Sequence, residues 1–241
     1  MAASGKVGAN IAFKIFPVVV WCPILPKSFS GRRKDAAETD YASQHQRDIM
    51  NHLVIFCHPS PASFNRAIAD SVEAVSGALG HDTRCRDLYG IAFNPILSKT
   101  DMHGTVQTVP QDVRQEQDFI SWADMLTFVY PVWWAGMPAM LKGYIDRVLC
   151  QGFAYRLHDD TVQGLLHGKR VLIFNTTALP SSLYTSQGMH QAMAMTTDTG
   201  IFELCGMEVL HHAFFGSMDK VPDEVRKSYL SEVVSITSRY L

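Results

Sequence analysis

The sequence has no CxxC pair, no long basic run and no uncharged apolar run of 18 residues. Its five cysteines are scattered and odd in number, which argues against a disulfide framework and is typical of a reducing, cytoplasmic compartment. Because Lys and Arg are not clustered and the formal net charge is −2, nucleic-acid binding is excluded as the main task. No integral membrane segment is expected either.

Glycine-rich phosphate motifs are missing as well. The loop after the first expected strand carries no GxGxxG, and no GxxxxGK followed by Ser or Thr occurs in the chain. These absences exclude the usual dinucleotide fingerprint and the P-loop. Ser181 and Ser182 lack a GxSxG elbow, which argues against a serine hydrolase.

The chain is expected to divide into an N-terminal extension and one folded domain. Residues 1–49 contain an apolar stretch that is broken by Lys14, Pro17 and Pro23 and followed by a polar stretch. A signal peptide would have a cleaner apolar segment and a small-residue cleavage site, so we expect residues 1–49 to be a disordered or non-native extension. Residues 50–241, opening at Met50, are enough for one well-filled core.

From residue 51 onward, apolar runs of strand length alternate with segments of helical periodicity. Strands are expected over 52–57, 83–88, 125–130, 169–175 and 209–213, and helices over 64–79, 111–122, 138–149, 187–195 and 222–240. This order predicts an α/β fold, a five-stranded parallel sheet with helices on both faces. Ligands of such sheets bind beyond the carboxyl ends of the strands, which selects the loops after Cys57, Tyr130 and Asn175.

The first of these loops runs from His58 to Arg66 and leads into a helix. Ser63, Asn65 and the free N–H groups of the helix make a natural phosphate site. Ser63 could equally serve only as the helix cap. The position of His58 directly after the first strand favours a hydrogen bond to a phosphate over simple packing.

The second loop is the most unusual stretch of the chain and consists of Pro131, Val132, Trp133 and Trp134 before a second proline. Bulky aromatic residues at the carboxyl end of a strand suit a large flat aromatic ligand, and they predict a flavin. Backbone groups of the loop would meet the edge of the ring, and an indole would meet its face. The alternative is that the two tryptophans belong to the core or to a dimer interface.

The third loop offers the hydroxyls of Thr176 and Thr177, followed by Tyr184 and His190. A tyrosine and a histidine together can donate protons to, and stabilise charge on, a flavin or a carbonyl acceptor. An isolated histidine is more often a core or surface residue whose hydrogen bonds are made within the protein. The presence of two other candidate ligand-binding loops favours the catalytic interpretation.

A metal site is not expected. His211 and His212, with Cys205, are the residues that could suggest one. Adjacent residues of a strand point to opposite faces of its sheet, so the two histidines are predicted to point apart.

Taken together, the three loops resemble those of the NAD(P)H:quinone oxidoreductase family, the DT-diaphorase type with a flavodoxin-like fold. The resemblance extends over about residues 51–229. Its most specific pieces are Ser63-Phe64-Asn65, Asp87-Leu88-Tyr89, Phe93-Asn94-Pro95-Ile96, Gly136-x-Pro138, Leu141-Lys142-Gly143, Phe153-Ala154-Tyr155, Thr176-Thr177, Tyr184-x-x-Gln187-Gly188-x-His190 and Cys205-Gly206.

The resemblance implies a role for each candidate residue. Tyr184 and His190 would be catalytic and would stabilise the charge that develops on the flavin. Tyr155 would cross a homodimer interface and, with Trp134, line the substrate pocket. Arg226 matches an arginine of the FAD-binding members, which favours FAD with FMN as the alternative. The residues implied to hold the cofactor are His58, Phe64, Asn65, Pro131, Val132, Trp133, Trp134, Thr176, Thr177, Tyr184 and Arg226.

The chain departs from the family at several positions. Members often have glutamine at Trp133, aromatic residues at Ala135 and Leu157, and two glycines at Ala178 and Leu179. Smaller side chains at 135 and 157 imply a roomier and less aromatic pocket. Substrate preference therefore cannot be carried over from the family.

The function implied is a flavin-dependent NAD(P)H oxidoreductase that reduces quinones or related acceptors by two electrons, through ping-pong hydride transfer with NAD(P)H as donor. The redox chemistry would belong to the cofactor, and the protein would position and polarise it. Two alternatives remain: a flavin-binding regulatory subunit of a membrane transporter, and a flavodoxin-like one-electron carrier.

Overall fold

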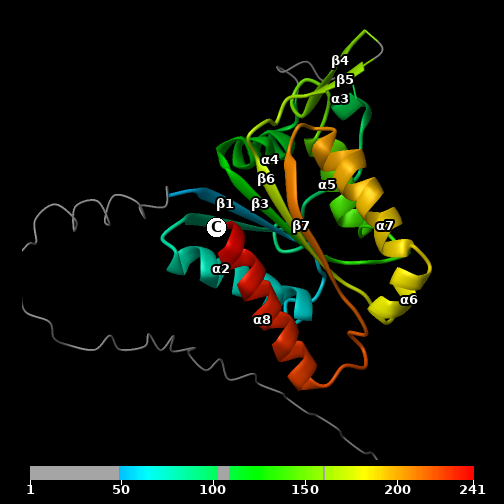
Figure 1. Cartoon of the computed structure of the whole chain (residues 1–241). Coiled ribbons are helices and arrows are strands. Elements are labelled where there is room, and N and C mark those ends of the chain that lie inside the picture. Colours follow the sequence, from blue (N-terminus) through cyan, green and yellow to red (C-terminus); the bar gives the residue numbers. More distant parts are fainter. Residues whose placement is uncertain (1–48, 103–108, 160) are drawn as a thin grey trace, which may run out of the picture. The chain divides into compact units, whose positions relative to one another are not determined.

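The computed structural model describes residues 49–102, 109–159 and 161–241. Its main sheet has five strands in the order β2-β1-β3-β6-β7, and every neighbouring pair is parallel (Figure 1). The expected five-stranded parallel sheet is confirmed. The strands are β1 (Asn51–Phe56), β2 (Asp82–Asp87), β3 (Met125–Pro131), β6 (Arg170–Thr176) and β7 (Glu208–Phe215).

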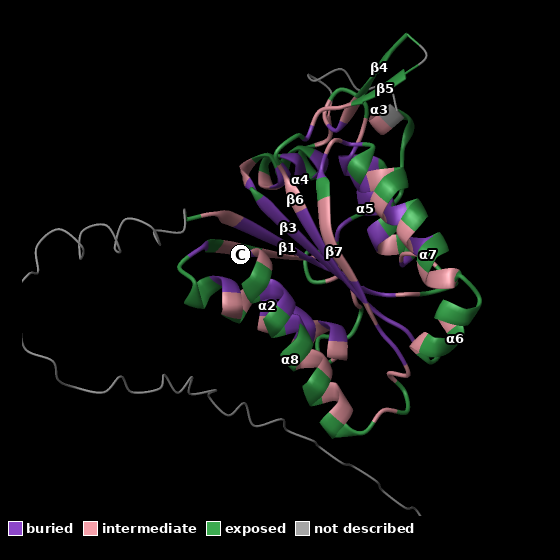
Figure 2. Ribbon diagram, in the orientation of Figure 1, coloured by how far each residue is buried: buried purple, intermediate pink, exposed green. Residues whose placement is uncertain are grey.

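Helices cover both faces of this sheet, as the sequence predicts. On one face, α2 (Phe64–Ala78) and α8 (Asp223–Tyr240) pack against the strands and against each other (Figure 1). The opposite face is covered by α4 (Gln111–Trp122), α5 (Ala139–Val148) and the π-helix η1 (Met195–Glu203). Strand β3 is consequently buried along its whole length, as Figure 2 shows for the centre of the sheet.

Local sequence explains where the first crossover begins and ends. The Ser63 hydroxyl accepts a hydrogen bond from the Arg66 N–H at 3.2 Å and caps the start of α2. Apolar residues at helical spacing, including Ile68 and Val72, are fully buried against the sheet. Gly80, at φ 85°, lets the chain turn into β2.

Helix α5 and the chain after β2 approach each other closely, and this contact explains the sequence motifs Phe93-Asn94-Pro95-Ile96 and Leu141-Lys142-Gly143. A Cβ added to Gly143 would lie 2.1 Å from the Pro95 carbonyl oxygen. Only a glycine allows this contact, which places the Phe93–Pro95 segment against the helix that follows the tryptophan loop.

Several elements were not expected from the sequence. They are the short helices α3 (Lys99–Met102) and α6 (Ser181–Ser186), the π-helix η1, and an antiparallel hairpin of β4 (Tyr155–His158) and β5 (Thr161–Gly164). The expected helix over 187–195 is present as α7 (Met189–Ala194), and the chain continues directly into η1 at Met195. The hairpin gave little periodic signal because both of its strands are largely exposed, with Leu157 and Val162 facing solvent.

The expectation for residues 1–49 lies, apart from Ile49, outside the described residues, and β1 begins at Asn51. Within the described ranges, none of the helices has the length and apolar content to cross a membrane.

Candidate functional site

The three loops selected from the sequence lie on neighbouring strands. The strand order reverses direction between β1 and β3, so the loops after these two strands flank the topological switch point at the carboxyl ends of the strands, called the crevice below, where ligands of such sheets bind. The loop after β6 is joined to the loop after β3, because the Val132 N–H donates to the Thr176 carbonyl at 2.8 Å. It is also joined to helix α2, because Thr176 Oγ1 donates to Asn65 Oδ1 at 2.8 Å.

In the first loop, Ser63 is the helix cap, as one of the two interpretations held. His58 is half-buried, and its Nδ1 accepts a hydrogen bond from the Ser60 N–H at 3.0 Å. In the tautomer that accepts this bond, Nε2 carries the ring proton; the Nδ1 atom also lies 3.2 Å from the Ser60 carbonyl oxygen. Phe64 packs against the core under α2, with its ring 6.5 Å from that of Tyr229.

Three buried polar atoms without a partner lie on candidate site residues. They are Asn65 Nδ2, His190 Nε2 and Arg226 Nε; among the described side chains only His81 Nε2 and Thr237 Oγ1 share this property. A buried donor without a partner costs about 1–3 kcal/mol, so such atoms are retained where a ligand satisfies them. Their concentration at the strand-end loops and at the start of α8 fits a polar ligand bound there.

The tryptophan loop forms a tight two-residue turn. The N–H and carbonyl groups of Trp133 and Gly136 exchange two 3.0 Å hydrogen bonds, and the central residues Trp134 and Ala135 have φ of 50° and 57°. A turn of this kind ordinarily uses glycine or asparagine, and each residue with a Cβ costs about 1–2 kcal/mol there.

The turn projects its indoles away from the core. The Trp134 side chain is fully exposed and Trp133 is 41% exposed, with its ring 6.3 Å from that of His58. The interpretation of the two tryptophans as core residues is therefore wrong. An exposed aromatic pair held in a strained turn beside the crevice suits contact with a flat ligand.

The loop after β6 is closed tightly on itself and on the loop after β7. The Thr177 N–H donates to the Phe215 carbonyl at 2.9 Å, and its hydroxyl donates to the Leu179 carbonyl at 2.9 Å. A Cβ added to Gly216 would lie 2.5 Å from the Ser181 nitrogen. Both threonines are buried and both hydroxyls are bonded within the protein, whereas the sequence suggested that they are offered to a ligand.

Tyr184 and His190 are brought together at the end of this loop. Their rings are stacked, 5.5 Å apart at an angle of 9°. The Thr185 hydroxyl donates to the Ser181 carbonyl at 2.9 Å, so its oxygen can only accept from His190 Nδ1 at 3.2 Å. The Nδ1 proton thus fixed leaves Nε2 with a lone pair in the neutral ring. Burial, together with the charge of His212, lowers the pKa of His190.

Sequence reasoning missed the residues behind this pair. The His190 ring stacks on Phe214 at 4.3 Å, and Phe214 stacks on His212 at 4.1 Å. His212 lies between Asp198 and Asn175 and forms hydrogen bonds of 2.8 and 2.7 Å to them. The adjacent histidines were a visible signal, but they were weighed only as metal ligands. The described residues contain no cluster of three possible ligands.

Arg226 lies at the start of α8, held against the loop after β7. Its guanidinium donates to the Met218 carbonyl at 3.0 Å and lies 3.6 Å from Asp223. The side chain is 37% exposed while its Nε is buried without a partner. A cation at this point is able to meet a phosphate of an extended cofactor.

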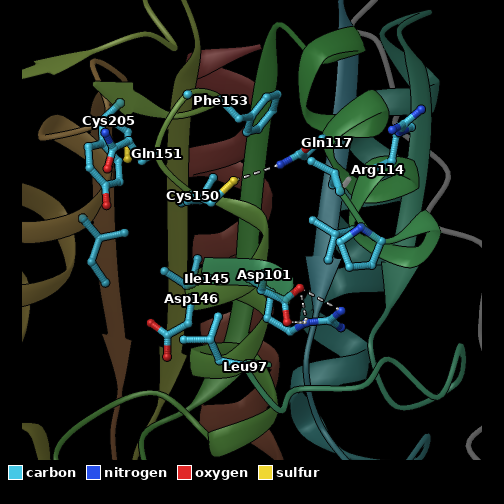
Figure 3. Close-up of a pocket in the computed structure, with 18 of the residues that line it drawn as sticks. Leu97, Asp101, Arg114, Gln117, Ile145, Asp146, Cys150, Gln151, Phe153 and Cys205 are labelled. Atoms are coloured by element: carbon cyan, nitrogen blue, oxygen red, sulfur yellow. Dashed lines mark hydrogen bonds and ion pairs between the residues drawn. The ribbon is translucent and has the colours of Figure 1, made fainter. Parts of the chain in front are cut away.

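Tyr155 is not brought into the same cavity as the other candidates. It lines a groove of about 1190 Å³ between α4, α5, the chain after α5 and η1. Figure 3 shows Phe153, Cys150 and Gln117 along this groove, with Gln117 donating to the Cys150 sulfur at 3.4 Å. None of the three strand-end loops contributes a residue to its lining.

The sequence of this chain is similar to those of known oxidoreductases. Residues 50–236 match the model of a family described as having a flavodoxin-like fold. A Haemophilus influenzae protein, named as an uncharacterized NAD(P)H oxidoreductase, is 42% identical over 75% of this chain and 91% of its own length. Rat NAD(P)H dehydrogenase (quinone) 1 is 29% identical over 76% and 74% of the two chains.

A solved structure agrees with these sequences. An NAD(P)H:quinone oxidoreductase from Methanothermobacter marburgensis superposes with a TM-score of 0.69 at 25% identity, over 80% of this chain and 96% of that one. The chain therefore belongs to the flavodoxin-like family that contains the NAD(P)H:quinone oxidoreductases.

Proposed function

We propose that this protein is a flavin-dependent NAD(P)H oxidoreductase that reduces quinones or related acceptors by two electrons. The observation that carries the proposal is that buried atoms of Asn65, His190 and Arg226 have no partner, and that these residues lie in the chain segments that follow β1, β6 and β7. Each belongs to a different part of the chain, and a single extended ligand with phosphate and ring groups would satisfy Asn65 and Arg226 and reach the Tyr184–His190 pair. Membership of an oxidoreductase family supports the same conclusion.

The phosphate end of the cofactor would lie at the start of α2. The free N–H groups there carry a partial positive charge, and Asn65 Nδ2 adds a donor that no protein group uses. His58 would donate from Nε2. Arg226 would reach the second phosphate of FAD, which is why we favour FAD; FMN, lacking that part, is the alternative.

The ring end would lie along the tryptophan turn and the loop after β6. Pro131, Val132, Trp133 and Trp134 would border the ring on one side, and Thr176 and Thr177 on the other. When bound, the flavin supplies the hydride chemistry that exchanges electrons between NAD(P)H and the acceptor. The exposed Trp134 indole would cover the acceptor, and Ala135 beside it would leave room for substrates of different shapes.

Tyr184 and His190 would act as the catalytic pair. The phenol of Tyr184 would donate a hydrogen bond to the ring edge where negative charge develops. His190, whose Nε2 lone pair is free in the neutral ring, would accept a hydrogen bond or a proton in turn.

We infer a homodimer from the position of Tyr155. Its groove lies away from the crevice of its own chain, so Tyr155 would complete the acceptor pocket of a second copy. The exposed apolar residues Leu157 and Leu204 near the groove would be covered in the same contact. We place the protein in the cytoplasm, with residues 50–241 as the flavin-binding domain and residues 1–49 as an extension outside it.

Steady-state oxidation of NADH and NADPH with a quinone tests this proposal. We expect parallel lines in double-reciprocal plots for the flavin-loaded protein, as the alternating use of one site by donor and acceptor requires. A flavin-loaded protein without turnover would be the regulatory subunit of a membrane transporter instead. Transfer to one-electron partners only would identify a flavodoxin-like carrier.

A further inference from the structure

A buried histidine behind the catalytic pair is held by two oxygen atoms. The His212 side chain is 5% exposed; its Nδ1 lies 2.8 Å from Asp198 Oδ1 and its Nε2 lies 2.7 Å from Asn175 Oδ1. The orientation of the Asn175 amide is fixed, because its Nδ2 donates to the Tyr130 carbonyl at 3.3 Å. Both ring nitrogens of His212 therefore face acceptors.

This arrangement determines the charge of His212. A neutral imidazole has one N–H donor and one lone pair, and the lone pair would face an oxygen in either tautomer. Only the imidazolium donates from both nitrogens, and the Asp198 carboxylate supplies its counter-charge. The doubly protonated ring is thus the state in which each nitrogen of His212 has an acceptor.

Two backbone irregularities build this network. A bulge between Val171 and Leu172 shifts the pairing of β6 with β7, so Val209 pairs with Val171 but His211 pairs with Leu172. The extra residue reverses the alternation and turns His212 toward η1, while His211 faces Tyr240 of α8. The wide turns of η1 bring Asp198 to the ring, and π-helical segments are frequent at functional sites.

Phe214 connects the cation to the catalytic pair. The rings of His212 and Phe214 are stacked 4.1 Å apart, those of Phe214 and His190 4.3 Å, and those of His190 and Tyr184 5.5 Å. The phenyl ring lies in stacking contact with both histidines and offers neither of them a hydrogen bond. His190 therefore experiences the charge of His212 without being able to exchange a proton with it directly.

We propose that His212 is a positioning residue: an imidazolium, paired with Asp198, that keeps His190 neutral and its Nε2 lone pair free. The inference rests on the proposed function only for what His190 does with that lone pair. A second proton on His190 would convert Nε2 from acceptor to donor and would abolish its use as the partner of Tyr184. The charge of His212 opposes this protonation, and burial of His190 acts in the same direction.

The other titratable groups around the stack do not replace this role. Asp198 is engaged by His212, and its charge also contributes to raising the pKa of the buried Tyr130 phenol, to about 12, after burial itself. Tyr184 is the remaining titratable neighbour. His211 lies on the opposite face of β7 and is a matched control in the same strand.

Histidine NMR titration of the full chain without cofactor is the test. In His212→Gln, we expect the His190 pKa to move up toward the ordinary histidine range, and in His211→Gln we expect no movement. Asp198→Asn, which keeps shape and removes the counter-charge, should neutralise His212 and move His190 in the same upward direction. As the pH is lowered, the rate of flavin reduction by NADH should begin to fall at a higher pH in the flavin-loaded His212→Gln protein than in the parent.

An unchanged His190 titration in folded His212→Gln would overturn the inference, as would a neutral His212 ring at pH 7 in the parent. Neither result depends on turnover. A shifted His190 in a protein that binds no flavin would refute the proposed function and leave the inference standing.

Discussion

Thr176 Oγ1 donates a hydrogen bond to Asn65 Oδ1 at 2.8 Å, joining the carboxyl end of β6 to the first turn of α2 across 111 residues of sequence. The bond fixes the Asn65 amide so that its Nδ2 is the free end, and this donor is buried without a partner. The amide oxygen of Asn65 therefore links α2 to β6, and its amide nitrogen stays available for a ligand.

Removing that donor should weaken cofactor binding. Asn65→Asp keeps the acceptor for Thr176 but places a negative charge where a phosphate is expected, and we predict an increase in the flavin dissociation constant of about 10–100-fold. Fluorescence titration of the apoprotein measures it. Asn51→Asp is the control, because Asn51 lies at the amino end of β1, away from the strand-end loops, and this change should leave the affinity unchanged. Equal affinities for Asn65→Asp and the parent would remove Asn65 from the site.

The catalytic pair should affect the rate of reduction rather than cofactor binding. Tyr184→Phe combined with His190→Ala removes the phenol donor and its partner, and we predict flavin reduction by NADH about 100-fold slower, with the cofactor still bound. Stopped-flow absorbance follows the reduction. An unchanged rate would mean that the stacked pair has only a structural role.

His52 should make stability sensitive to acid. It is fully buried between Ser76 and Thr127, and burial lowers its pKa from 6.5 to about 3. Between these values the unfolded chain takes up a proton that the folded protein does not bind, so this contribution to stability is present above pH 6.5 and is lost as the pH falls. From pH 7 to pH 5 the loss is about 2 kcal/mol.

Urea unfolding at the two pH values checks this contribution. His52→Gln can hydrogen-bond both hydroxyls without titrating, so its stability should fall less between pH 7 and pH 5 than that of the parent. A variant of His158, whose side chain is 71% exposed, should behave like the parent. Parallel losses in His52→Gln and the parent would show that His52 is not responsible.

The proposed dimer can be tested with two residues of equal exposure. Leu204, 40% exposed, lines the groove beside Cys205, whereas Val234, 41% exposed, lies on α8 over the opposite face of the sheet. We predict that Leu204→Glu converts a dimer into a monomer and lowers turnover, while Val234→Glu changes neither. Light scattering coupled to size exclusion gives the mass. A monomeric parent protein that turns over would remove Tyr155 from the acceptor pocket.

The sheet could be predicted because its central strands β1, β3 and β6 are apolar along most of their length and because the helices between the strands have a clear period. A strand such as β3 is buried on both faces, so its sequence is a continuous run of mostly apolar residues. The strands β4 and β5 of the exposed hairpin contain no such apolar run. Short helices such as α6 have too few residues for periodicity to distinguish them from a loop.

The loops of the site were located by a rule about strand ends, but the network behind His190 was not. Its geometry depends on the bulge in the β6–β7 pairing and on the π-helical turn that carries Asp198, and neither irregularity has a sequence signature. The prediction that His211 and His212 point apart is confirmed. Tyr155 lines the groove between α4, α5 and η1, and its role across a dimer interface stays a prediction.

The central claim is that the crevice between β1 and β3 holds a flavin. The most direct test is to purify the protein, record its visible spectrum, release any bound cofactor and identify it by mass. We predict a yellow protein that releases FAD. A colourless protein that takes up neither FAD nor FMN would contradict the account.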